Sequence, residues 1–106
     1  MNDSLFIRKT EGLFTRVDSR VVILVEASGG WSKIITKEGV HLVSSTLGQL
    51  EEQLPVALFC RVHRTYIAAL EHISSFTANS VRILDRDIPL SRSYAEKLFS
   101  RLNIIM

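Results

Sequence analysis

The chain has 106 residues, of which 46% are hydrophobic and 23% charged, and its formal net charge is +2. These values predict one globular domain over residues 1–106, because the apolar content suffices for one core and the charges are dispersed. No purely apolar run is longer than that of Val21 to Val25, which is far shorter than the roughly 20 residues that span a bilayer. The single cysteine, Cys60, excludes an internal disulfide, and we expect a cytoplasmic protein without membrane insertion.

Short strands separated by turn residues are predicted in the first half of the chain. Each is rich in β-branched or aromatic residues, and glycine-containing pairs stand between several of them. The predicted strands are LFIRKT (5–10), LFTRVD (13–18), VVILVEA (21–27), WSKIITK (31–37) and VHLVS (40–44). Their spacing of about 8 to 12 residues favours an antiparallel all-β arrangement over alternating strands and helices.

A short central helix is predicted over Leu47 to Leu54. Thr46 and Gln49 fit a capping box, and leucines then recur at helical spacing until Pro55 ends the run.

A second helix is predicted at the C-terminus. Ser93 and Glu96 fit a second capping box, and Tyr94, Leu98 and Leu102 form an apolar stripe.

Further strands are expected between the two helices, with turns at 78–80 and 86–87. They are YIAAL (66–70), HISSFT (72–77), VRILD (81–85) and DIPLS (87–91). Pro89 has no backbone N–H to donate, so its strand is expected to be an edge strand or to start there.

The most basic segment is FCRVHRTY, residues 59–66. It contains Arg61, His63 and Arg64, and no acidic residue occurs at positions 53–70. Arginine holds a phosphate or a guanine edge through its planar fork of donors, which makes this segment a candidate binding face.

Structural roles are the alternative for the same segment. Arg61 or Arg64 could instead pair with Glu51 or Glu52, and charge composition does not separate the two roles.

Two further places are candidate anion or DNA contacts. Arg92 lies between two serines at a helix start, where free N–H groups and the helix dipole favour anions; alternatively, the serines only cap the helix and Arg92 is solvated. The glycine-rich tip SGGWSK, residues 28–33, carries Trp31 and Lys33. Trp31 could instead be a core residue at the start of its strand.

Motifs for catalysis, nucleotides and metals are absent from the sequence. Neither G-x-G-x-x-G nor G-x-x-x-x-G-K-S/T occurs, and the histidines and Cys60 match no zinc spacing. Cys60 and His63 are too close in the chain for a nucleophile–base relay, so we expect Cys60 to be buried beside Phe59. We expect no enzyme activity, no cofactor and no metal.

Four segments together resemble the LytTR DNA-binding domain of bacterial transcriptional regulators, over nearly the whole chain. They are ILVEASGGWSKI (23–34), TLGQLEEQLP (46–55), FCRVHRTYIAALEHI (59–73) and VRILDRDIPLSRSYAEKL (81–98). The pattern F-x-R-V-H-R-S/T-Y is the most specific of these. The resemblance implies a mainly β fold of about ten short strands in small antiparallel sheets, with a short central helix and a C-terminal helix. It also implies that loops, rather than a recognition helix, enter successive DNA grooves.

The resemblance also implies which residues contact DNA. The positions matched to the contacting loops of the family are Trp31, Ser32, Lys33, His63, Arg64 and Arg92. Relatives often have a longer or more polar residue where Ser32 stands, so Lys33 is expected to supply a phosphate contact. His63 is expected to position its loop or to touch phosphate rather than a base. Relatives usually have Val-Asn where this chain has Ala68-Ala69, outside the three loops.

The predicted function is a sequence-specific duplex-DNA-binding domain of a bacterial transcriptional regulator of the response-regulator type. Two copies are expected on paired direct-repeat sites, as a possible homodimer on DNA. Many relatives join this domain to a phosphoacceptor receiver domain, and no phosphorylation site matches in this chain. The alternative is a protein-interaction or sensory module that has lost DNA affinity and recruits a partner through strand edges or through Val21 to Val25.

Overall fold

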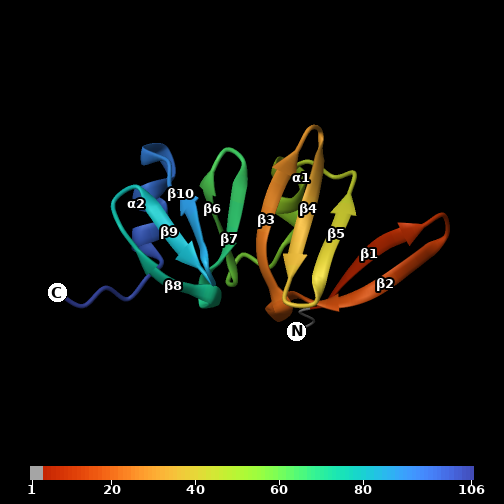
Figure 1. Ribbon diagram of the computed structural model, residues 1–106, viewed down its shortest axis with the longest axis horizontal. Coiled ribbons are helices and arrows are strands. Elements are labelled where there is room, and N and C mark those ends of the chain that lie inside the picture. Colours follow the sequence, from red (N-terminus) through yellow and green to blue (C-terminus); the bar gives the residue numbers. More distant parts are fainter. Residues whose placement is uncertain (1–3) are drawn as a thin grey trace.

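The computed structural model describes residues 4–106, in which ten strands form three antiparallel sheets accompanied by two α-helices (Figure 1). The strands are β1 (Ser4–Thr10), β2 (Leu13–Asp18), β3 (Val22–Ser28), β4 (Trp31–Thr36), β5 (Gly39–Val43), β6 (Phe59–His63), β7 (Tyr66–Ala69), β8 (Ile73–Phe76), β9 (Ser80–Ile83) and β10 (Arg86–Pro89). The helices are α1 (Leu47–Gln53) and α2 (Arg92–Ser100), and short 3-10 turns lie at Ser19–Val21 and Leu70–His72. The expected mainly β class is confirmed. Within the described range, no helix is long and apolar enough to cross a membrane.

The three sheets follow one another along the long axis of a molecule that measures 49 × 31 × 25 Å (Figure 1). The β1–β2 hairpin lies at one end, and the small sheet of order β10-β9-β8 lies with α2 at the other. Between them is the five-stranded sheet of order β5-β4-β3-β7-β6. β3 therefore joins strands that are distant in sequence, since Val25 pairs with Ile34 of β4 and with Ile67 of β7.

β3 occupies the centre because its apolar run is covered on both faces. All four residues of Val22–Val25 are buried, as expected for a continuous hydrophobic strand between two layers. On one face Val25 belongs to the core beneath α1, and on the other Leu24 belongs to the core shared with Leu98 of α2. This burial removes Val22 to Val25 from the surfaces that could recruit a partner, so the alternative prediction is wrong for these four residues, whereas Val21 is partly buried.

The start of α1 agrees with the predicted capping box. The Gln49 N–H donates to Thr46 Oγ1 over 3.2 Å, and the Thr46 N–H donates to Gln49 Oε1 over 2.9 Å. The helix ends at Gln53 because Pro55 disfavours helical geometry at the residue before it, Leu54.

The start of α2 differs from the prediction. Arg92 is the first helical residue and Ser91 is the N-cap, so the predicted capping box of Ser93 and Glu96 is wrong. The physical reason is a tertiary hydrogen bond, in which the Ser91 N–H donates to the Val62 carbonyl of β6 over 2.9 Å. This bond fixes the chain at Ser91, which precedes the predicted capping residue Ser93 in the sequence.

The last hairpin turn also lies two residues before its predicted place at 86–87. Arg86 and Asp87 are the first residues of β10, and the turn falls on Leu84 and Asp85, where Leu84 has a φ of 53°. Asp87 pairs with Arg82 across the two strands, with an ion pair of 2.9 Å. β10 is an edge strand, which agrees with the position of Pro89.

Candidate nucleic-acid interface

Three segments that carry predicted site residues lie together along one edge of the molecule, uppermost in Figure 1: the β3–β4 turn, the β6–β7 turn and the start of α2. The Ala27 N–H donates to the Thr65 carbonyl over 2.9 Å and so joins the first two segments. The Ser91 N–H bonded to the Val62 carbonyl joins the third. We call these segments the turn edge, which comprises residues 28–33, 63–66 and 91–93. The fold therefore brings together positions that are far apart in the sequence.

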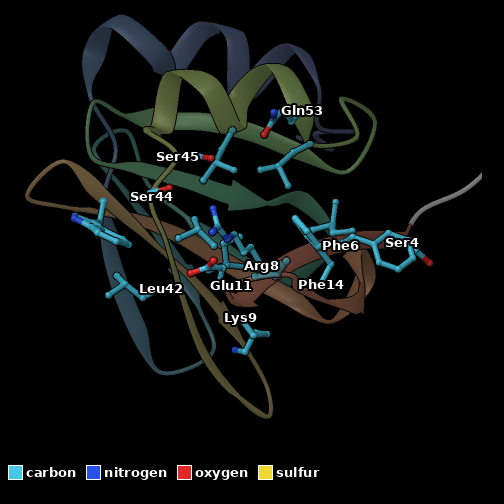
Figure 2. Close-up of a pocket in the computed structure, with 17 residues that line it drawn as sticks. Ser4, Phe6, Arg8, Lys9, Glu11, Phe14, Leu42, Ser44, Ser45 and Gln53 are labelled. Carbon is cyan, nitrogen blue, oxygen red and sulfur yellow. The ribbon is translucent and has the colours of Figure 1, made fainter.

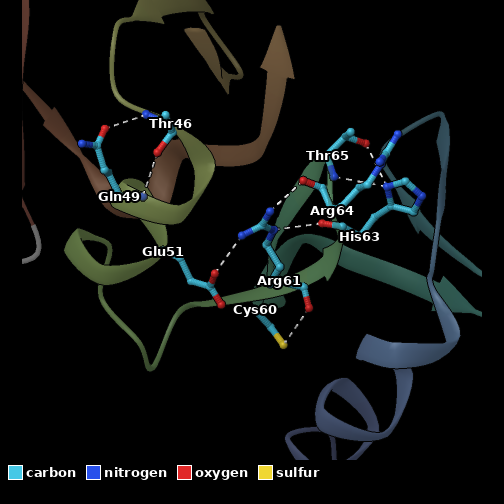
Figure 3. A network of polar contacts seen from close by, with 8 residues as sticks. All are labelled: Thr46, Gln49, Glu51, Cys60, Arg61, His63, Arg64 and Thr65. Carbon is cyan, nitrogen blue, oxygen red and sulfur yellow. Dashed lines mark hydrogen bonds and ion pairs between the residues drawn. The ribbon is translucent and has the colours of Figure 1, made fainter. Parts of the chain in front are cut away.

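Arg61 and Arg64 have different environments, which resolves the alternative roles of this basic segment. Arg61 is largely buried and pairs with Glu51, with Nη1 to Oε1 at 2.8 Å (Figure 3). Its Nε donates to the His63 carbonyl over 2.9 Å and its Nη2 to the Arg64 carbonyl over 2.7 Å. The Arg64 side chain is exposed, and among residues 4–106 its guanidinium has no hydrogen-bond or ion-pair partner. Arg61 is thus the structural cation, and Arg64 is available to a ligand.

His63 is tied to its own turn through one ring nitrogen. The Thr65 N–H donates to His63 Nδ1 over 3.2 Å, and Thr65 Oγ1 lies 2.9 Å from the same atom (Figure 3). Because Nδ1 accepts the backbone N–H, the ring proton lies on Nε2 in this arrangement. His63 therefore orients the turn and offers one donor, Nε2–H.

Tyr66 ends the β6–β7 turn with a second local contact. Its hydroxyl donates to Glu26 Oε2 over 3.2 Å, and its ring centroid lies 5.9 Å from that of His63. Burial, followed by the adjacent Glu26 carboxylate, raises the pKa of Tyr66, so the hydroxyl stays protonated as a donor. The turn is therefore held by side chains on both of its flanks.

Two of the three predicted DNA-contacting residues at the β3–β4 tip are exposed to solvent. Trp31 is 50% exposed, and Lys33 is exposed on the same side of β4 because side chains alternate along a strand. Ser32 lies between them with 0% exposure, and its hydroxyl donates to the Ser45 carbonyl over 2.7 Å. The prediction of Ser32 as a DNA contact is corrected on this ground, because its side chain is turned into the protein and already bonded. The exposure of Trp31 also excludes the core alternative for that residue.

Arg92 is the exposed first residue of α2, at the positive end of the helix dipole. No Ser91 side-chain oxygen caps the helix, in contrast to the capping role that the sequence left open for the serines. Within the described part of the chain, the Arg92 guanidinium has no ion-pair partner. Donors from the side chain and the helix start therefore converge on this part of the turn edge.

Cys60 lies away from this edge, inside the core, as predicted. It is 3% exposed, and burial raises the pKa of its thiol, which disfavours the nucleophilic thiolate. Across residues 4–106, no three histidine, cysteine or carboxylate side chains gather as metal ligands. The turn edge itself offers cations, N–H donors and an indole ring, a set that suits an anionic polymer with stacked bases.

Sequence reasoning missed a groove of about 770 Å³ beside the β1–β2 hairpin, bounded by β5 and α1 (Figure 2). The exposed side chains of Phe6, Phe14 and Leu42 line it. The hairpin is linked to β5 by Lys9 Nζ, which lies 2.7 Å from His41 Nδ1. Burial, and then the Lys9 charge, lower the pKa of His41, so the ring is neutral and accepts this bond. The apolar aromatic residues of β1 and β2 were the available signal, but only the fold shows that they stay exposed.

Comparison with known proteins adds independent evidence. Residues 13–103 match the family model described as LytTr DNA-binding domain. The chain is 33% identical over 95 residues to the CO-responsive transcriptional regulator RcoM of Rhodospirillum rubrum, covering 83% of this chain and 40% of that protein. It is 32% identical over 94 residues to the sensory transduction protein LytT of Bacillus subtilis, covering 83% and 39%. The chain thus spans about two fifths of the length of the curated relatives it matches.

A solved structure shows the same fold. The LytTr DNA-binding domain of a putative methyl-accepting/DNA response regulator from Bacillus cereus superimposes with a TM-score of 0.79. The match covers 98% of this chain and 100% of the other at 23% identity, so it supports the fold alone.

Proposed function

Because this chain belongs to the LytTR family of DNA-binding domains, we propose that it binds duplex DNA sequence-specifically through its turn edge, as part of a bacterial transcriptional regulator in the cytoplasm. LytTR is a DNA-binding fold and not an enzyme family. One observation carries the proposal: Arg64 and Arg92 are both exposed on segments that the Ser91 to Val62 hydrogen bond holds together, and in residues 4–106 neither guanidinium has an ion-pair partner.

Each exposed residue of the turn edge has a role that follows from its chemistry. Arg64 and Arg92 each present a planar fork of donors, which suits a guanine edge or a phosphate. Lys33 supplies a point charge for a phosphate, and Trp31 supplies a flat ring beside it. His63 orients the Arg64 turn and can donate from Nε2. Two of these segments enter the DNA as turns between strands, and the third enters with the first residues of α2.

We further propose that two copies occupy paired direct-repeat sites, each through the same turn edge. The two copies then face the same direction along the duplex, which distinguishes them from a two-fold symmetric pair on a palindrome. A footprint of two equal segments, protected in the same orientation, supports this arrangement. One protected segment, or inverted segments, would contradict it.

The salt dependence of binding tests the proposal against the remaining alternative, a module that recruits a protein through the hairpin groove or a strand edge. Duplex affinity is measured over a series of salt concentrations. With Arg64 at a base edge, contacts from Lys33 and Arg92 to two phosphates give a log–log slope of roughly −1.8 per bound copy. A slope near zero, or the absence of duplex binding, would overturn the DNA function and leave the protein-recruiting one.

A further inference from the structure

Arg61 points away from solvent, yet it contacts the turn that carries Arg64. We propose that Arg61 is a positioning residue for DNA binding: its guanidinium sets the backbone of the β6–β7 turn so that the Arg64 side chain projects from the turn edge. This inference rests on the proposed function and deepens it, because it names the residue through which Arg64 obtains its direction.

The two carbonyls that Arg61 holds belong to the peptide bonds on either side of the Arg64 Cα. Its Nε donates to the His63 carbonyl over 2.9 Å and its Nη2 donates to the Arg64 carbonyl over 2.7 Å (Figure 3). The orientations of these two peptide planes determine the φ and ψ angles of Arg64. Fixing both planes therefore fixes the direction of the Arg64 Cα–Cβ bond.

These carbonyls lie next to an irregular part of the strand pairing. The β6–β7 register shifts between Arg61 and His63, where the regular ladder is interrupted. A bulge of this kind leaves backbone groups outside the ladder and redirects side chains. The Arg61 fork satisfies the carbonyls and so stabilises the irregular turn in one conformation.

The third donor atom of the Arg61 guanidinium, Nη1, connects the turn to the rest of the fold. Arg61 Nη1 donates to Glu51 Oε1 of α1 over 2.8 Å, and Arg61 Cζ lies 5.8 Å from the centroid of the Tyr94 ring in α2. The Arg61 side chain is only 13% exposed, so its charge is not presented to DNA as that of Arg64 is. The Arg61 side chain thus contacts α1, the turn that carries Arg64, and α2.

Arg61→Lys is the informative substitution, because it keeps the positive charge and removes the planar fork. A lysine ammonium is a single point and cannot reproduce three donations fixed in one plane. The matched control is Arg82→Lys, in which an exposed arginine paired with Asp87 over 2.9 Å lies outside the turn edge. Thermal unfolding of each variant of the 106-residue chain verifies that it folds.

A double-mutant cycle with Arg64→Ala measures whether Arg61 acts through Arg64. We expect Arg61→Lys to weaken duplex binding about tenfold in the wild-type chain and less than about twofold in Arg64→Ala, since residues that act as a unit are non-additive. Arg82→Lys is expected to leave affinity unchanged. Equal losses from Arg61→Lys in both backgrounds, or no loss in either, would overturn the inference.

A DNA-independent readout separates this inference from the proposed function. In the free protein, ¹⁵N relaxation reports the order parameters of the Arg64 and Thr65 amides, which we expect to fall from about 0.85 to below about 0.6 in Arg61→Lys. Unchanged order parameters would contradict a positioning role. If no variant binds duplex DNA, the proposed function fails, and the relaxation data still decide whether Arg61 holds the turn.

Glu51→Gln is a second variant for the case in which Arg61→Lys does not fold. It removes the ion pair and leaves Arg61 with its two carbonyl partners. We expect its loss of affinity to be smaller than about tenfold and to vanish in Arg64→Ala, as non-additivity requires. A loss that persists in Arg64→Ala would contradict the inference.

Discussion

Arg64 is exposed on a turn whose backbone is held by Arg61, so its truncation changes a surface group without disturbing the core. We expect Arg64→Ala to weaken binding to a specific duplex by about 1–3 kcal/mol, the usual worth of a bidentate base contact. A gel-shift titration against Arg82→Ala, which removes an equal charge outside the turn edge, measures the difference. Equal affinities for Arg64→Ala and wild type would show that Arg64 does not contact DNA.

Ser32 and Lys33 are neighbours in sequence, but we expect substitution of Ser32 to change stability and substitution of Lys33 to change DNA binding. The buried Ser32 hydroxyl donates to the Ser45 carbonyl, so Ser32→Ala should lower the free energy of unfolding by about 1 kcal/mol, as for a typical lost hydrogen bond. Lys33→Ala should weaken DNA binding and leave unfolding unchanged. Urea unfolding and duplex titration of both variants check this pair. A Ser32→Ala variant with normal stability and weak DNA binding would restore Ser32 as a contact.

The sequence contained a signal for the burial of Ser32 between Trp31 and Lys33, but none for the different roles of Arg61 and Arg64. The alternation of Trp31, Ser32 and Lys33 on one strand already places Ser32 on the opposite face from the other two. The division between Arg61 and Arg64 has no such signal. Both are arginines in one basic segment, and the acceptors of Arg61 are two backbone carbonyls of the turn beside a shift in the strand register.

At the scale of elements, the β1–β2 hairpin is joined to β5 by a bond that depends on pH. Burial and Lys9 lower the pKa of His41 below its ordinary value of 6.5, so the unfolded chain binds the proton more tightly than the folded one. The stability contribution of neutral His41 is therefore full above pH 6.5 and is lost as the pH falls through the lowered pKa of the folded state.

His41→Gln tests this coupling. Urea midpoints at about pH 7.5 and about pH 5 should differ less in His41→Gln than in wild type, because the substitution removes a group whose pKa is lower in the folded than in the unfolded chain. His72→Gln is the matched control, since His72 Nε2 lies beside the Arg20 carbonyl, away from Lys9. An identical pH dependence in wild type and His41→Gln would contradict the role of this bond.

Helix starts show how far local sequence determines an element. The α1 capping box was predicted because Thr46 and Gln49 satisfy each other within four residues, with no help from the rest of the fold. The start of α2 was placed wrongly because a bond from Ser91 to β6 competes with the local box. The turn at Leu84 was displaced for a related reason, since the pairing of Asp87 with Arg82 sets the register.

At the scale of the whole molecule, the turn edge exists because β3 pairs with both β4 and β7. This pairing places the tip after β3 next to the turn before β7, and the Ala27 to Thr65 hydrogen bond joins them. Strand positions could be predicted from periodicity, but the order β5-β4-β3-β7-β6 could not, because periodicity does not specify which strands become neighbours. The resemblance supplied the fold class, and the structure supplied the arrangement of the three segments.

We propose that this arrangement of the three segments recognises particular duplex sequences. Selection of bound fragments from random duplex DNA by the 106-residue chain, in parallel with Arg64→Ala, tests it most directly. We expect wild type to enrich one motif, repeated in the same orientation, and Arg64→Ala to lose preference at defined positions of that motif. Enrichment of no motif by a folded wild-type chain would contradict sequence-specific binding through the turn edge.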